Sequence, residues 1–186
     1  VAGRGDARLG VERSSLHGRV RAGQALLDHR LVVQPHVGIS SHSIDGMTGL
    51  GARPARPTAA LPSPGTRQTG LRPGLDLQFD TRDERLQATS GVLLQATWAQ
   101  YVSLDATPLR FDQAEIDAYG YLPLGGPHRL AVRLSGMTTQ SRGDAPVPIY
   151  MLPRLGGEQV PGLARGQFVG NDRLISSLLY RFPLKR

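Results

Sequence analysis

Two carboxylates and a guanidinium lie within four residues at Asp80, Arg82 and Asp83, a set that can bind a metal ion or transfer protons. They stand where one alternating segment ends, shortly before Gly91 begins another. Aspartate at such a position more often caps a turn or pairs with a neighbouring cation. We therefore interpret these four residues as a structural turn signature rather than as a catalytic site.

The other reactive side chains do not form a catalytic or cofactor-binding pattern. The five histidines lack the H-E-x-x-H spacing of a zinc site, and the sequence contains neither a G-x-S-x-G nor a G-x-x-x-x-G-K-[ST] motif. The absence of cysteine excludes a disulfide framework and thiolate metal sites. We expect no enzyme activity, no metal ion and no cofactor.

Composition narrows the class of protein without choosing it. With 186 residues, 39% of them hydrophobic, the chain can form one domain with a core. No run approaches 18 apolar residues, and the N-terminus does not have the pattern of a signal peptide, so a helical membrane protein is not indicated. The net charge is +7, but the arginines are scattered and aromatic residues make up only 5%. Nucleic acid is therefore not an expected partner.

Apolar and polar residues alternate along most of the chain, which is typical of strands whose two faces meet different surroundings. Leu130, Val132 and Leu134, for example, alternate with Arg129 and Arg133. No comparable stretch has the 3.6-residue period of an amphipathic helix. The sequence predicts an all-β chain of about eight strands. Apolar positions of the other segments are Leu31 to Ile39, Leu75 to Phe79, Val92 to Leu104 (broken only by Gln100) and Ala114 to Leu124, at every second residue.

The lengths of these segments favour strands that cross a membrane. Several hold about ten residues or more, the length of a tilted transmembrane strand, whereas soluble strands usually hold 5 to 6. The connections alternate between long (44–69, 140–171) and shorter ones, which places both long loops at the same end of an antiparallel barrel. Residues 1–186 are thus predicted to form one partial transmembrane β-barrel of the outer-membrane type.

The polar faces of the predicted strands carry charged groups that suit a water-filled lumen. The candidates that face this lumen are Glu115, Asp117, Arg129 and Arg133. A soluble lipocalin-like barrel or β-sandwich produces the same alternation, with the apolar side chains pointing into a dry core. The residues alone leave both interpretations open.

Five short motifs occur in the order and spacing of one known family. The segment Gly74–Asp83 contains the sequence D-T-R-D and is followed by Gly91, and Tyr121–Leu124, His128–Leu134, Pro148–Gly157 and Tyr180–Leu184 come later. Together they resemble the C-terminal barrel of the bacterial surface-antigen family, which includes the BamA/TamA outer-membrane assembly factors. The resemblance covers roughly residues 71–184.

This resemblance implies a location in the bacterial outer membrane and a role in assembling or inserting other proteins there. In the family, a weak lateral seam lets client strands pair with an exposed edge. The implied partners are outer-membrane lipids, unfolded outer-membrane proteins, and periplasmic or lipoprotein components. A polypeptide-secretion or passive pore built on the same barrel is the alternative, and a soluble β-sandwich binding domain is a weaker one.

Two features depart from the family pattern. The family's long loop carries an arginine that pairs with acidic groups of the lumen wall, but here the matching tetrad contains proline instead. Arg165 lies close enough to substitute, just before Gly166 and Phe168. The family barrel has sixteen strands and this chain covers about half of them, so we expect an open, curved sheet. The tetrad falls on Val160, Pro161, Gly162 and Leu163.

Overall fold

The structure, a computed structural model, describes residues 10–48, 67–106, 108–157, 160–164 and 166–182. Within these ranges the regular structure is β, apart from one 3-10 turn, so the all-β prediction is confirmed. No helix in the described ranges is long and apolar enough to cross a membrane. The elements are β1 (Gly10–Arg21), β2 (Gln24–Leu26), β3 (Leu31–Thr48), β4 (Arg67–Asp80), β5 (Gly91–Ser103), β6 (Arg110–Pro123), β7 (Arg129–Ser141), η1 (Ile149–Met151), β8 (Arg154–Leu155), β9 (Phe168–Val169) and β10 (Asp172–Arg181).

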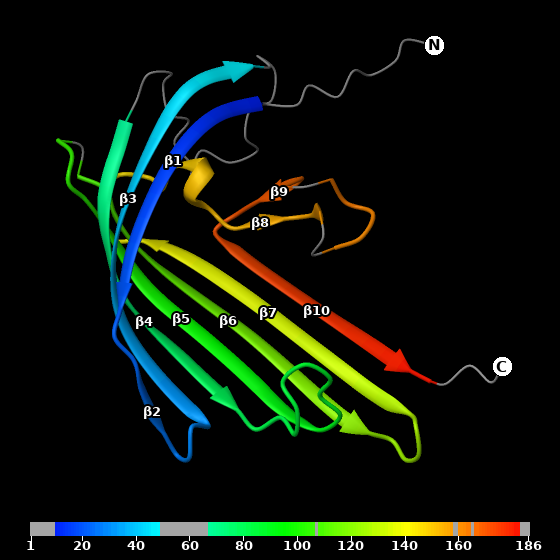
Figure 1. Ribbon diagram of the computed structural model, residues 1–186. Helices are drawn as coiled ribbons and strands as arrows, with labels where there is room; N and C mark the ends of the chain where they lie inside the picture. The colour runs from blue at the N-terminus through cyan, green and yellow to red at the C-terminus, as the bar shows by residue number, and fades with distance from the viewer. Residues whose placement is uncertain (1–9, 49–66, 107, 158–159, 165, 183–186) are drawn as a thin grey trace, which may run out of the picture.

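Eight of the strands form one antiparallel sheet in the order β1-β3-β4-β5-β6-β7-β10, with β2 also paired to β3 (Figure 1). Arg21 pairs with His36 and Gln24 with Val33, so β1 and β2 follow each other along the same edge of β3. They therefore act as one long strand interrupted at residues 22–23. The sheet is not closed, since β1 and β10 are its outer strands, and the expected open sheet is confirmed.

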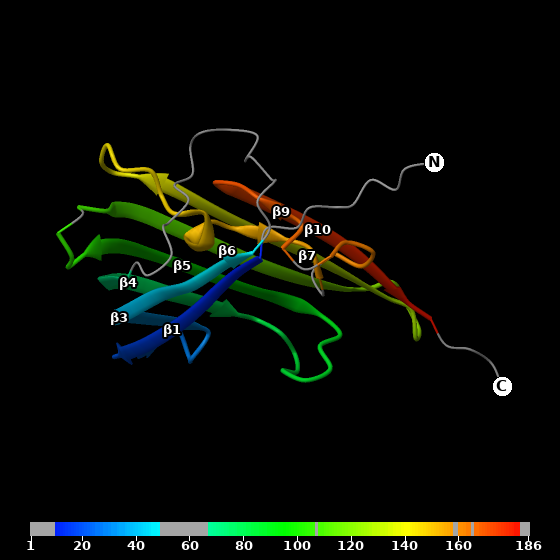
Figure 2. The same ribbon diagram turned by 90° about the horizontal axis from the view of Figure 1, so that it is seen from above.

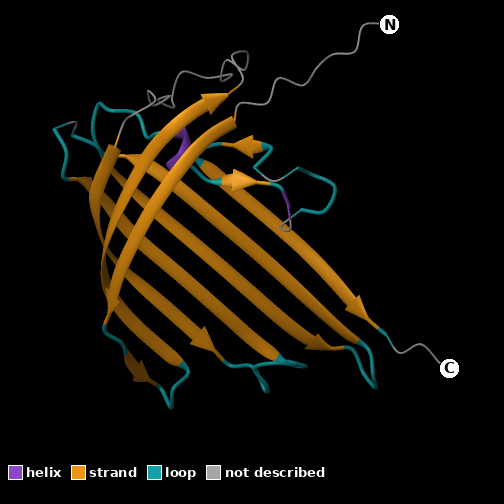
Figure 3. Ribbon diagram, turned by 45° about the horizontal axis from the view of Figure 1, so that its top comes forward, coloured by secondary structure: helices purple, strands orange, loops and turns teal. Residues whose placement is uncertain are grey.

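The connections alternate between the two ends of the sheet (Figure 3). The turns that follow β2, β4 and β6 lie at one end, and β3, β5 and β7 lead to the opposite end. The strands run further into the predicted long loops than expected, since β3 reaches Thr48 and β4 begins at Arg67. Residues 49–66 lie outside the described part of the chain. The predicted loop 140–171 begins after Ser141 and contains η1, β8 and β9.

Antiparallel pairing joins the alternating residues of neighbouring strands into two continuous faces. Leu75 pairs with Trp98, which pairs with Ala114, whereas Thr97 pairs with Asp76 and Glu115. We call these the apolar face and the polar face. On the apolar face many of the large side chains are 38–75% exposed. They include Leu16, Ile39, Leu71, Leu77, Trp98, Ile116, Val132, Leu134, Leu174 and Leu178.

The sheet curves around the segment that holds η1, β8 and β9, as the view from above shows (Figure 2). Tyr150 of η1 is hydrogen-bonded to Gln68, and the carbonyl of Met151 accepts a hydrogen bond from Gln113. Both partners belong to the polar face by their register. The concave side is therefore the polar one, and the exposed apolar face is convex.

Candidate functional site on the polar face

An apolar cluster fixes the segment after β7 against one end of the polar face. Tyr101 and Phe111 stack with ring centroids 4.9 Å apart, and Val147 and Leu152 from the segment join them together with Leu109. All five side chains are buried. This cluster is the main buried apolar core of the described residues, and it forms only because the loop returns to the sheet.

Hydrogen bonds orient the loop on this cluster. The Tyr150 hydroxyl lies 2.6 Å from Gln68 Oε1, and Gln113 Nε2 donates to the Met151 carbonyl oxygen at 3.3 Å. Pro148 precedes the turn and accepts a hydrogen bond from the Met151 amide at 2.9 Å. Because proline fixes its own φ, it helps to present Tyr150 toward the sheet.

The tip of the loop forms a small hairpin. The Val160 amide donates to Gly157, the Leu163 amide to Val160 and the Gly157 amide to Leu163, at 3.0–3.3 Å. These bonds hold Val160, Pro161, Gly162 and Leu163 in a turn, with Pro161 and Gly162 exposed. Gly166 has a φ of +66°, and Phe168 pairs with Leu155 between β8 and β9. Arg165, the predicted substitute for the family's loop arginine, lies outside the described residues.

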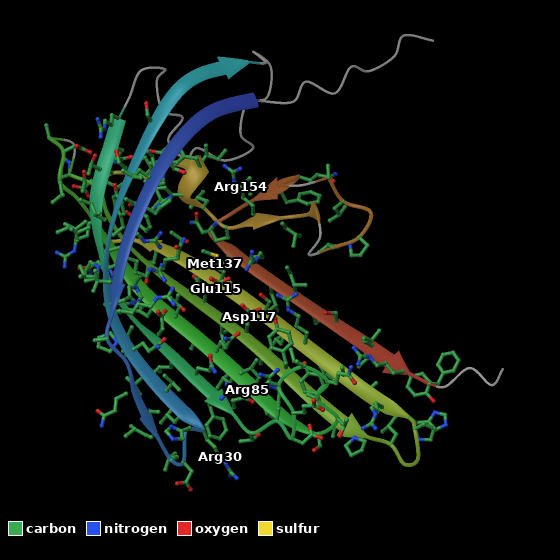
Figure 4. All side chains as sticks on the ribbon, viewed as in Figure 1. Arg30, Arg85, Glu115, Asp117, Met137 and Arg154 are labelled. Carbon is green, nitrogen blue, oxygen red and sulfur yellow. The ribbon has the colours of Figure 1, made fainter. Side chains whose placement is uncertain are left out.

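The acidic groups of the wall have arginine partners from the sheet itself. Arg173 of β10 lies 3.1 Å from Glu115, and Arg133 of β7 lies 3.1 Å from Asp117. Arg173 also donates to the Arg154 carbonyl oxygen of the loop at 3.4 Å. In Figure 4, Glu115 and Asp117 lie on the concave side of β6, with Arg154 above them.

Arg129, the fourth lumen-facing candidate, lies on the same face at the far end of β7. It pairs in register with Arg181 of β10, which places two guanidinium groups next to each other on the polar face. Three of the four predicted residues, Glu115, Asp117 and Arg133, thus belong to ion pairs, and Arg129 does not lie in their cluster.

A second charged cluster on the polar face was not predicted from the sequence. Asp76 of β4 lies 3.1 Å from His36 Nδ1, while Arg21 and Arg19 of β1 approach it to 3.7 and 3.9 Å. The Thr97 hydroxyl donates to Asp76 at 2.9 Å. Three neighbouring strands contribute these groups besides β4, and the alternation fixes only the face on which each one lies.

The turn signature forms a compact hydrogen-bonded unit between β4 and β5. Two guanidinium nitrogens of Arg82 each lie 2.9 Å from Asp80. Asp83 Oδ1 accepts the amides of Glu84, Thr89 and Ser90, and the Thr89 hydroxyl donates to Oδ2. No group of three or more potential metal ligands occurs within the described ranges. The arrangement is that of a capped turn.

Replacing Asp83 with alanine is expected to open this turn, because three amides and one hydroxyl lose their acceptor together. Amide hydrogen exchange at Thr89 and Ser90 measures the effect, and we expect both to exchange much faster in Asp83→Ala. Asp83→Asn keeps one carbonyl oxygen and should give an intermediate rate. Unchanged protection in Asp83→Ala would contradict this account of the turn.

The same turn should depend on pH in a defined direction. The hydrogen bond from the Thr89 hydroxyl, followed by those from the Thr89 and Ser90 amides, lowers the pKa of Asp83 below its usual value. A lowered folded pKa means that the stabilisation is fully present above the unfolded pKa of about 3.9 and is lost as the pH falls through the folded value. The Ser90 amide should therefore stay protected from exchange at pH 4 and lose this protection only in stronger acid. Loss of Ser90 protection already near pH 5 would contradict the lowered pKa of Asp83.

Comparison with models of known protein families gave no match, and comparison with curated proteins gave no significant similarity. The resemblance of residues 71–184 to the surface-antigen barrel therefore remains a prediction.

Proposed function

We propose that this sheet is part of an outer-membrane β-barrel, with lipid against its apolar face and water against its polar face. The observation that carries the proposal is the inverted distribution of side chains. Val132 and Leu134 are 38% and 43% exposed on the convex side, while Arg133 and Asp117 pair on the concave side. A soluble sandwich would cover its apolar face with a second sheet. Within the described residues, the other sheet is the two-stranded β8-β9.

The size of the apolar band supports the same proposal. On β4, apolar residues occupy every second position from Leu71 to Phe79, which corresponds to about 26 Å at roughly 3.3 Å per residue. A tilt of about 40° reduces this to roughly 20 Å of membrane thickness, near the ~25 Å band of outer-membrane barrels. Beyond this band the face becomes polar at Thr69, and Tyr180 and His128 stack near the opposite end.

We infer that the complete barrel assists the assembly or insertion of other proteins into the outer membrane. The resemblance of residues 71–184 supports this role. The loop on the polar face also supports this role over a pore, because it partly fills the concave side. Tyr101, Phe111 and Gln68 hold it there. A secretion pore or passive pore of the same superfamily is the second candidate, favoured by the charged, wettable concave wall around Glu115 and Asp117.

Partition into detergent tests the membrane assignment. The full chain, refolded and subjected to detergent phase separation, should collect in the detergent-rich phase, since its apolar face needs a lipid-like cover. A folded chain that remains in the aqueous phase would exclude the barrel and favour a soluble domain. Circular dichroism in both phases verifies that the β structure is present.

Two measurements on reconstituted liposomes separate the candidate roles. An assembly factor should accelerate the folding of an unfolded outer-membrane protein, measured as protease-resistant client, relative to empty liposomes. A pore should instead give a large steady ion conductance that does not change when residues 142–171 are deleted. Conductance without any effect on the client would replace the assembly role by the pore.

A further inference from the structure

The apolar face carries exposed arginines at the end where β3, β5 and β7 finish. Arg67 pairs in register with Ser43, and Arg110 with Val102, so both belong to the apolar face. Arg67 Nε donates to the Ser41 hydroxyl at 3.1 Å, and Arg110 donates to Gln100 Oε1 at 3.0 Å. Both arginines are exposed. Together with Ser41 and Ser43 we call them the arginine rim.

Among the described residues, neither arginine of this rim forms a direct ion pair with a carboxylate. Asp112, which lies on the same face, interacts electrostatically with Arg110, but its hydrogen bonds come from Arg142 at 2.6 Å and from Gln100 at 3.0 Å. No carboxylate oxygen of the described residues lies within 4.0 Å of a guanidinium nitrogen of Arg67 or Arg110. Their hydrogen-bond partners are a hydroxyl and an amide, which are neutral. The rim therefore has two guanidinium groups without a direct carboxylate partner, which an external anion can contact.

A hollow next to Arg67 combines donors with an apolar contact. It has a volume of about 320 Å³ and is lined by Ser15, Leu16, Ser41, Ser43 and Arg67. Phosphate oxygens accept hydrogen bonds from a planar guanidinium and from hydroxyl groups, and the hollow contains both kinds of donor. The presence of Leu16, which is 75% exposed, gives the hollow an apolar border as well.

We propose that the arginine rim binds the phosphate groups of anionic membrane lipids. The register places the phosphate-binding groups directly beside the apolar band. Down the β3-β4 pair, Ser43/Arg67 is followed by Ser41/Thr69 and then by Ile39/Leu71. A lipid whose phosphate contacts Arg67 has its acyl chains beside Ile39 and Leu71, whereas a free phosphate ion leaves that surface unused. The inference rests on the proposed membrane location and adds a lipid class to it.

The opposite end of the apolar face has a different chemistry. Tyr180 pairs in register with Leu130 on that face, and its hydroxyl lies 2.6 Å from His128 Nδ1. The strand arginines at this end, Arg129 and Arg181, pair in register on the polar face, and Arg30, Arg82 and Arg85 lie in the turns. This asymmetry orients the sheet with the arginine rim toward the membrane leaflet that carries the phosphate-rich lipid.

The test compares two double variants of the full chain in nonionic detergent micelles. Phosphatidic acid is the anionic probe and phosphatidylcholine the zwitterionic one, with bound lipid counted by native mass spectrometry across a titration. Arg67→Gln/Arg110→Gln should bind phosphatidic acid roughly tenfold to thirtyfold more weakly, since each basic residue near a lipid surface contributes about 1 kcal/mol. Arg129→Gln/Arg181→Gln removes the same charge from the polar face and should bind it as the wild type does.

Each other outcome overturns the inference. Equal loss of phosphatidic acid in both double variants would show that only net charge matters. Equal binding of the two lipids by the wild type would remove the phosphate selectivity. Displacement of phosphatidic acid by equimolar inorganic phosphate would define a free-anion site. This competition uses the wild type alone, so it decides the matter even if the rim variant does not fold.

Failure of this inference is distinguishable from failure of the proposed function. A chain that partitions into detergent but binds both lipids alike keeps its membrane assignment and lacks only the rim site. A chain that stays in the aqueous phase loses both.

Discussion

Replacement of Gly91 by alanine is expected to destabilise the sheet by roughly 2–5 kcal/mol. Gly91 has a φ of +99°, a conformation that residues with a Cβ rarely adopt. A Cβ at this position would also lie 2.4 Å from the Thr81 carbonyl oxygen and 2.8 Å from Arg82 Cα. Both of these are backbone atoms, so no side-chain rotation can relieve the overlap. The β4-β5 turn must deform instead.

Gly125 provides a matched control for this prediction. It has the same φ of +99°, but a Cβ there would meet no atom within 4 Å. Gly125→Ala should therefore cost only the conformational part, about 1–2 kcal/mol. Denaturant unfolding in detergent micelles, followed by the fluorescence of the single tryptophan, Trp98, measures both variants. Equal losses in the two would show that the contact with Thr81 is unimportant.

Leu152→Asp is expected to release the loop from the polar face while leaving the sheet folded. Leu152 is 7% exposed and packs with Val147 and Tyr101. A carboxylate without a partner in this cluster would cost several kcal/mol, which exceeds what the hydrogen bond from Tyr150 to Gln68 supplies. The strands keep their backbone pairing. Limited proteolysis between residues 142 and 171 should become at least about tenfold faster.

A substitution at the loop tip separates docking from added charge. Phe168→Asp places the same carboxylate in the loop, but Phe168 is 53% exposed and pairs in register with Leu155 of β8. Its proteolysis should stay near the wild-type rate. If Leu152→Asp is cleaved as slowly as Phe168→Asp, the cluster around Tyr101 does not hold the loop.

The faces of the strands were predictable because side chains alternate strictly along a strand. Once Leu130, Val132 and Leu134 are assigned to one face, Arg133 must lie on the other, and antiparallel pairing extends this to every neighbour. The turn around Asp80 and Asp83 was predictable for a similar reason, because its hydrogen bonds are local.

The limits of the strands and the partners of the charged groups were not predictable in this way. The apolar signal of β3 ends at Ile39, but its backbone pairing continues through Ser41 and Ser43 to Thr48. Partners such as Glu115 and Arg173 are 58 residues apart in the chain and meet only across β7. Alternation assigns each to the polar face, and it contains no information on which cation reaches which carboxylate.

The order of the strands also restricts how any closed barrel can form. Each neighbouring pair along β1-β3-β4-β5-β6-β7-β10 is antiparallel, so β1 and β10 point in the same direction. Direct contact between them, or between β10 of one molecule and β1 of another in the same membrane orientation, would make a parallel seam. Uniform antiparallel closure instead requires an odd number of intervening strands. The resulting barrel has an even count, as bacterial single-chain barrels do.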